Sequence, residues 1–379
     1  MRFLLFSDLH LHSWKYGSTV SEGWNSRLER QAAVVRGMFE YAARKGIRLI
    51  LFSGDWYHTP SRVATEVLAT AARIKEALPQ DIHLIAIPGN HDIKTKGLES
   101  LSVMNSSNFH VISSEKHFST KEFLPNAEDE LHLSVLPYTE DSQVLQQFFE
   151  KVGSSKEKRF VLLHQGVSSV ELNSKGFTLN ELLKPDMIPS NVVQAFSGHY
   201  HSFKRVSDKL TIPGSLMQHT WADKGENRGF LDVTWTGSSM HMQHINTALR
   251  RPTVPATRST APEFIEFTVG ESVVDARSRL QAAGWRPSWN NGSVLEDKIR
   301  GNIVRIISSS PVLESYRKKL MDMGPASLEI VYDEQSTEDK YDVDSKSSFE
   351  SLTELFEDYV TRYKLDDDLV ATGRQIINV

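Results

Sequence analysis

Short apolar segments recur along the first part of the chain, and five of them end at side chains that carry oxygen or imidazole nitrogen. The earliest segment, Phe3 to Phe6, is followed at once by Asp8 and His10. Amphipathic segments such as Leu28 to Arg44 lie between them. Buried strands that alternate with amphipathic helices are typical of a parallel sheet covered by helices. The pattern therefore predicts an α/β fold in which the polar strand ends meet at one edge.

The periodicity of the apolar residues places the individual elements. An opening strand–helix–strand–helix–strand unit is predicted at Phe3–Phe6, Leu28–Arg44, Ile47–Phe52, Ala64–Leu78 and Ile82–Ile87. Further strands are predicted at Leu131–Leu136, Phe160–Leu163, Val192–Phe196, Leu210–Ile212 and Phe230–Trp235. Because these later strands follow one another more closely, we expect them to form a second, mixed sheet.

Changes in composition divide the chain into four parts. Proline and arginine between Arg250 and Arg258 predict a linker. A smaller module follows it, with strands predicted at Phe264–Val269, Ile303–Ile307 and Leu328–Tyr332 and helices at Val273–Ala283 and Val312–Met321. We therefore expect a main α/β domain at residues 1–248, a linker at 249–262 and a small α+β domain at 263–333. Residues 334–379 would form an acidic tether and a C-terminal helical segment.

The polar residues at the strand ends form the candidate site. They are Asp8, His10, Gly54-Asp55, Gly89-Asn90-His91-Asp92, His164 and Gly198-His199-Tyr200-His201. Any one of these pieces alone is more often an ordinary polar residue at a strand end. Burying the whole set without a ligand, however, would cost several kcal/mol. The set therefore predicts a metal site at the strand ends.

The absence of cysteine narrows the chemistry. Disulfides, zinc–thiolate sites and cysteine nucleophiles are excluded, so a metal must be held by oxygen and imidazole nitrogen, which suits manganese, iron, zinc or magnesium. The formal net charge of −5 gives no global basic field of the kind that marks a DNA-coating protein. No stretch reaches the ~20 apolar residues of a membrane span. We therefore expect no membrane association and a cytoplasmic location.

The motif order D-x-H, G-D, G-N-H-D, H and G-H-x-H resembles the calcineurin-like metallophosphoesterase superfamily. The resemblance implies a four-layer αββα sandwich that binds two divalent metal ions. The ligands it implies for one ion are Asp8, His10, Asp55 and His201. Those it implies for the other are Asp55, Asn90, His164 and His199, so that Asp55 bridges the two. His91 is similar to the general acid of the family, and Asp92 to the residue that orients it.

Three features resemble the SbcD family, cellular and phage nuclease subunits that act with SMC-like ATPases in DNA end processing, repair or recombination. They are the run Gly54-Asp55-Trp56-Tyr57-His58, the segment Ile212-Pro213-Gly214-Ser215-Leu216, and the linker with its small module. The resemblance implies a DNA exonuclease and endonuclease that uses manganese, with magnesium as the alternative, and whose His58 faces DNA. It also implies a homodimer, a DNA-capping role for residues 263–333, and an SbcC-like ATPase that binds the helix predicted at Phe349–Tyr363.

Alternatives stay open at this point for the function and for three structural features. The chain could instead be a phosphatase or small-molecule phosphodiesterase of the same superfamily, or a scaffold that kept the fold and lost catalysis. His58 either contacts DNA or packs beside the metal ligands. The apolar face of the second helix either mediates the dimer or covers the sheet; its residues are Ala64, Leu68, Ala71 and Ala72. The C-terminal helix either binds the ATPase or packs on its own module.

Overall fold

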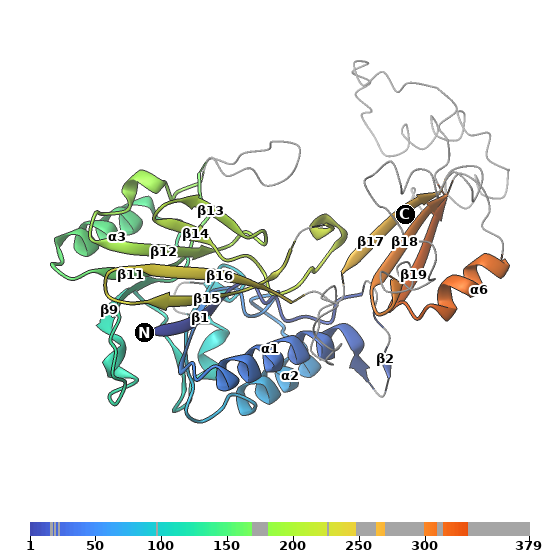
Figure 1. Ribbon diagram of the computed structural model, residues 1–379, viewed down its shortest axis with the longest axis horizontal. Helices are drawn as coiled ribbons and strands as arrows, with labels where there is room; N and C mark the ends of the chain where they lie inside the picture. The colour runs from blue at the N-terminus through green and yellow to red at the C-terminus, as the bar shows by residue number, and fades with distance from the viewer. Residues whose placement is uncertain are drawn as a thin grey trace, which may run out of the picture. The chain divides into compact units, whose positions relative to one another are not determined.

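The computed structural model describes most of the first 332 residues (Figure 1). Outside the described part lie residues 16–17, 19, 22, 96–97, 169–180, 226, 248–262, 270–298, 309–313 and 333–379. The predicted linker, the helix at Val273–Ala283, the acidic tether and the C-terminal helix fall among these residues. The chain divides into the units Met1–Asp333 and Glu334–Val379, and the described residues belong to the first. The domain boundaries therefore stay predictions.

The first of two six-stranded sheets has the order β16-β15-β1-β4-β5-β8. Its parallel strands are β1 (Arg2–Phe6), β4 (Leu49–Ser53), β5 (His83–Ile87) and β8 (Phe109–Val111). Two antiparallel strands extend it beside β1, namely β15 (Gly229–Trp235) and β16 (Met240–Asn246). We predicted the strand at Phe230–Trp235 in the second sheet, and this was wrong. Strand β15, late in the sequence, returns to pair with β1, a long-range contact that local periodicity does not reveal.

The second sheet has the order β13-β14-β12-β11-β10-β9. Its strands are β9 (Lys116–Ser119), β10 (His132–Leu136), β11 (Arg159–His164), β12 (Val192–Gly198), β13 (Lys204–Ser207) and β14 (Leu210–Ile212). The neighbours β10, β11, β12 and β14 run parallel, whereas β9 and β13 are antiparallel edge strands. The mixed character predicted for this sheet is confirmed.

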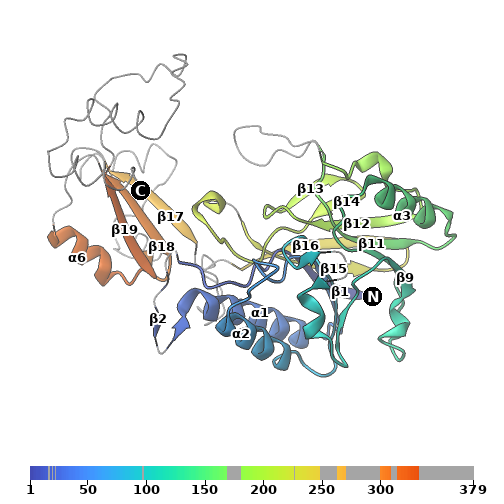
Figure 2. The same ribbon diagram turned by 180° about the vertical axis from the view of Figure 1, so that it is seen from behind.

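The two sheets pack face to face and helices cover their outer faces (Figure 1). Along β1, Phe3 and Leu5 point between the sheets while Leu4 and Phe6 point toward the helices. Both faces are buried, so the strand reads as an unbroken apolar run. Two helices cover the first sheet, α1 (Ser26–Arg44) and α2 (Thr65–Glu76), and α3 (Ser142–Ser154) covers the second, as the reverse view in Figure 2 also shows. The predicted four-layer αββα sandwich is confirmed.

A separate three-stranded parallel sheet follows the sandwich in the sequence. It contains β17 (Phe264–Val269), β18 (Ile303–Ser308) and β19 (Ser327–Tyr332), with α6 (Glu314–Asp322) between the last two. Its own apolar core is Ile265, Ile299, Val304, Ile306 and Leu320. The short elements elsewhere are β2 (Val20–Ser21), β3 (Trp24–Asn25), β6 (Ile93–Thr95), β7 (Leu98–Glu99), η1 (Leu101–Met104), η2 (Thr120–Glu122), η3 (Pro185–Met187) and η4 (Trp221–Asp223).

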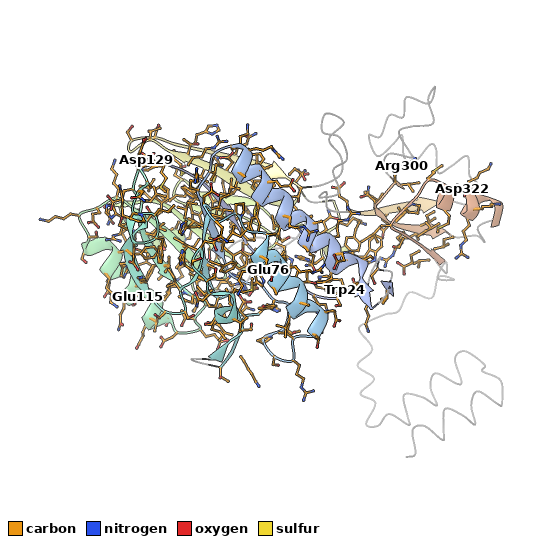
Figure 3. All side chains as sticks on the ribbon, turned by 90° about the horizontal axis from the view of Figure 1, so that it is seen from below. Trp24, Glu76, Glu115, Asp129, Arg300 and Asp322 are labelled. Atoms are coloured by element: carbon orange, nitrogen blue, oxygen red, sulfur yellow. The ribbon has the colours of Figure 1, made fainter. Side chains whose placement is uncertain are left out.

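Helices α1 and α2 lie side by side, with Trp24 just before α1 and Glu76 at the end of α2 labelled in Figure 3. The apolar face that we predicted on α2 is divided. Ala71 is buried against the core, whereas Leu68 is 44% exposed. Only part of that face is therefore available to another molecule. Within the described ranges, no helix has the length and apolar character needed to cross a membrane.

Candidate metal centre

All seven predicted ligands lie at the carboxyl ends of strands from both sheets. Asp8 and His10 follow β1, Asp55 follows β4 and Asn90 follows β5. His164 ends β11, while His199 and His201 follow β12. The sheets are stacked with these ends on the same side, so residues far apart in the sequence come into contact. The His199 N–H, for example, donates a hydrogen bond at 3.1 Å to Oδ1 of Asp8, which lies 191 positions earlier.

One group of potential ligands consists of Asp8, His10 and His201, whose donor atoms lie within 4.8 Å of one another. The Nε2 atoms of His10 and His201 are 3.0 Å apart. His10 Nε2 also lies 3.9 Å from Asp8 Oδ1 and 3.6 Å from Asp55 Oδ2. Four nitrogen and oxygen donors thus face a common point, which fits a divalent cation.

A second group contains Asp8, Asp55 and His164. Asp55 Oδ2 lies 3.2 Å from His164 Nε2, and the amide oxygen of Asn90 lies 3.1 Å from both His164 Nε2 and His199 Nδ1. The same Asp55 oxygen therefore faces His10 on one side and His164 on the other. That position fits a carboxylate shared between two ions.

Backbone geometry explains how short motifs direct so many side chains inward. Asp8, His10, Asp55 and His199 adopt positive φ angles of 51°, 44°, 64° and 96°. Non-glycine residues rarely adopt this conformation, and it is concentrated at functional sites. Two backbone hydrogen bonds hold the loop, from the Asp8 N–H to Gly54 O and from the His10 N–H to Asp55 O, each at 3.0 Å.

The glycines of the motifs make room for the ligands. A Cβ atom on Gly54 would lie 2.2 Å from His164 Nδ1, and one on Gly89 would lie 2.2 Å from Asp55 Oδ1. Any side chain at either position would displace a candidate ligand. In the G-D and G-N motifs, therefore, one residue is a candidate ligand, and the glycine before it leaves room for a different ligand.

The predicted acid, His91, is half-buried beside the ligand groups. Its Nδ1–H donates to the carbonyl oxygen of His58 at 2.6 Å, and its backbone N–H donates to Asp55 Oδ1 at 2.8 Å. The His91 Nε2 atom is consequently the ring nitrogen left to exchange a proton with another molecule.

Asp92 has different partners from the one we predicted. Its fully buried carboxylate accepts hydrogen bonds at 2.9–3.1 Å from four backbone N–H groups. The donors are Asp55, Trp56, Tyr57 and Gly89. Asp92 thus fixes the loop that carries Asp55, and the backbone of His58 orients His91 in its place. The D-x-H and G-N-H-D patterns could not reveal this, because the four donors are main-chain atoms.

The ring of His58 lies among the site residues. Its Nδ1 is 3.4 Å from His10 Nδ1, and its ring stacks on His91 at 5.3 Å between centroids. Trp14 packs against it at 4.5 Å. His10, His58 and His91 also form a third group of potential ligands. Because the ring is only half-buried, part of it stays accessible to another molecule.

Charges in the site are strongly coupled. Burial raises the pKa of Asp8 to about 6. Burial by itself would lower the pKa of His164, but the adjacent Asp55 carboxylate raises it to about 9. Burial by itself would raise the pKa of Asp55, but the positive charge of His164 lowers it below its usual value. An imidazole must be neutral to coordinate a metal, so metal binding at His164 would release a proton.

Three further residues border the site and have no place in the sequence motifs. His219 is fully buried, its Nε2–H donates to Asp8 O at 3.1 Å, and its ring lies 5.4 Å from the rings of both His10 and His201. Asp223 lies beside His201, with Oδ1 3.4 Å from His201 Nδ1. The ring of Tyr138 stacks on His199 at 6.2 Å. Spacing gave no signal for these residues, because folding brings them to the strand ends from other loops.

A two-sheet sandwich whose strand ends bring together Asp, Asn and His side chains without cysteine has the architecture of a metal-dependent phosphoester hydrolase. The family model of the calcineurin-like phosphoesterases matches residues 1–211. The chain belongs to this family, whose members hydrolyse phosphoesters with divalent metal ions.

Several solved structures are similar to the chain at low identity. A dimetal phosphatase from Danio rerio shares 11% identity, with 65% of this chain and 96% of that chain covered and a TM-score of 0.41. The calcineurin-like phosphoesterase YfkN from Bacillus subtilis shares 11% identity, with 64% of this chain and 88% of that chain covered and a TM-score of 0.37. The nuclease MPE from Pseudomonas putida shares 13% identity, with 64% of this chain and 84% of that chain covered and a TM-score of 0.28.

Proposed function

We propose that the chain is a two-metal DNA nuclease, the SbcD-like subunit of a complex with an SMC-like ATPase. The observation that carries this proposal is the position of His58. In the run Gly54–His58, Trp56 and Tyr57 are buried in the core, whereas the His58 ring lies half-buried against His10 and His91. A side chain in that position can contact a substrate strand that extends past the reacting phosphate.

The donor set supports a role for two ions, most simply Mn²⁺, with Mg²⁺ as the alternative. Asp8, His10, Asp55 and His201 would hold one ion. Asp55, Asn90, His164 and His199 would hold the other. When bound, such ions would supply the charge that neutralises a phosphodiester and lowers the pKa of a nearby water.

The remaining chemistry belongs to His91. Departure of an alkoxide from phosphorus requires a proton, and a positioned imidazole can donate it. Since the Nδ1–H of His91 is engaged with His58 O at 2.6 Å, the proton would pass from Nε2. Asp92 would act indirectly, because it holds the backbone of the Asp55 loop.

The partners follow from the same proposal. Residues 263–333, whose described part contains β17–β19 and α6, would cap the DNA, and the segment 334–379 would bind an SbcC-like ATPase. A homodimer would use the exposed part of α2, where Leu68 is 44% accessible. Light scattering at micromolar concentration should give a dimer, and a monomer would contradict this part of the proposal.

A substrate comparison tests the proposed function. We expect the purified protein with Mn²⁺ to cut linear duplex and single-stranded DNA and to lose that activity with a chelator. The comparison substrates are bis(p-nitrophenyl) phosphate, a small diester, and p-nitrophenyl phosphate, a monoester. Release of inorganic phosphate from nucleotides or from the monoester, with DNA left intact, would favour a phosphatase or a small-molecule phosphodiesterase instead.

A further inference from the structure

We infer that Asp223 is a positioning residue for the metal centre, which holds His201 in the ring orientation and tautomer that a metal ligand requires. Asp223 Oδ1 lies 3.4 Å from His201 Nδ1, on the side of the ring away from His10. With the ring proton on Nδ1, facing this carboxylate, His201 Nε2 keeps its lone pair, which faces His10 Nε2 at 3.0 Å. The inference rests on the proposed function, because it takes His201 to be a ligand.

A second ligand in the same site has an equivalent arrangement. His164 Nδ1–H donates to the carbonyl oxygen of Ser53 at 2.6 Å, and its Nε2 faces Asp55. Metal-binding histidines generally donate their other ring N–H to a carboxylate or a backbone carbonyl, which fixes the tautomer and the ring plane. Asp223 occupies for His201 the place that Ser53 O occupies for His164.

The Asp223 carboxylate is itself firmly held. It is 6% exposed and accepts hydrogen bonds from the N–H groups of His219 at 2.8 Å and Thr220 at 3.0 Å. The buried guanidinium of Arg228 donates to Oδ1 at 2.8 Å and also bonds to the backbone carbonyl oxygen of His201. Arg228 thus ties the carboxylate and the backbone of the ligand together. A rigid support of this kind can fix a ligand ring to the accuracy that catalysis needs.

The other interpretation of Asp223 is purely local. It closes the capping box of η4, in which the Thr220 side chain accepts from the Ala222 N–H at 3.3 Å. Thr220→Val loosens the same turn without touching His201 and therefore isolates this role. Asp232→Asn provides a second control. Asp232 is a similarly buried aspartate that pairs with an arginine, Arg2, and it lies on β15 rather than beside a ligand.

The test is Mn²⁺ binding to the full chain without DNA, by calorimetry and by electron paramagnetic resonance. Asp223→Asn keeps the shape, but an amide cannot accept from all four donors around this side chain. We expect its affinity for one of two ions to fall 10- to 100-fold, the usual effect of losing such a partner. At metal concentrations that fill both wild-type sites, the spectrum should change from a coupled ion pair to an isolated ion. Thr220→Val and Asp232→Asn should keep wild-type binding.

The outcomes separate the inference from the proposed function. If the wild type binds fewer than two Mn²⁺ ions, the two-metal proposal itself is wrong. If the wild type binds two ions and Asp223→Asn binds both with unchanged affinity, only the role of Asp223 is refuted. Equal losses in Thr220→Val would likewise refute it, in favour of the turn. Should Asp223→Asn fail to fold, Asp223→Glu retains the charge for Arg228 but displaces the carboxylate from His201, and the same selective loss is expected.

Discussion

Gly54→Ala tests how closely the loop after β4 of the first sheet packs against His164, the candidate ligand at the end of β11 in the second sheet. Gly54 has a φ of +95°, and an added Cβ would lie 2.2 Å from His164 Nδ1 and 2.9 Å from the Cα atom of Gly89. His164 is fully buried and bonded to Ser53 O, so it has little room to retreat. The substitution adds one methyl group and removes no functional atom.

The magnitude of the effect follows from these distances. Ordinary contact begins at 3.4 Å, so the His164 ring or the loop must move by about 1 Å. A displacement of about 1 Å in a catalytic arrangement can cost on the order of 100-fold in rate. The positive φ adds roughly 1–2 kcal/mol of backbone strain for a residue with a Cβ. We therefore expect about 100-fold slower hydrolysis of a small phosphodiester, together with weaker Mn²⁺ binding.

Gly237→Ala is the matched control. Gly237 has nearly the same φ, +90°, but a Cβ there would meet nothing within 4 Å. It should lose unfolding free energy through the same backbone strain but keep wild-type activity. Thermal unfolding, calorimetric Mn²⁺ titration and the rate of hydrolysis of the small phosphodiester would measure stability, metal binding and activity. Normal metal binding and rate in Gly54→Ala, or an equal loss of rate in Gly237→Ala, would refute the steric argument.

Three further outcomes are expected. Asp55→Ala should abolish Mn²⁺-dependent hydrolysis because it removes the carboxylate facing both ligand groups, and normal cutting with metal bound would contradict the shared-ligand assignment. His91→Ala should retain Mn²⁺ yet react roughly 10²–10⁴-fold more slowly, the usual contribution of a general acid; loss of metal in calorimetry would instead make His91 a ligand. A chain that ends at Ser347 should bind Mn²⁺ and cut DNA but fail to co-purify with an SMC-like ATPase, and an unchanged affinity for the ATPase would rule out the C-terminal helix as the docking element.

The sequence by itself predicted the α/β class and the candidate ligands, and its resemblance to a known family implied the four-layer sandwich. Strands buried on both faces read as continuous apolar runs, and the helices that cover them keep a helical period, so β1, β4, β5 and α1 were predictable. The motifs at the strand ends combine ligand-type side chains with glycines, and both are visible in the sequence. The polar, alternating sequence of β16 gave no such signal, and that strand was not predicted.

Only the tertiary structure decided which atoms meet. The pairing of β15 with β1 depends on a contact across more than 200 residues, and its energy is absent from any local window. The partners of Asp92 are backbone N–H groups, which every residue type except proline carries, so no side-chain pattern marks them. Asp223 reaches His201 because η4 follows a loop that returns to the strand ends. Periodicity predicts buried faces, whereas the support around a ligand depends on how separate loops pack together.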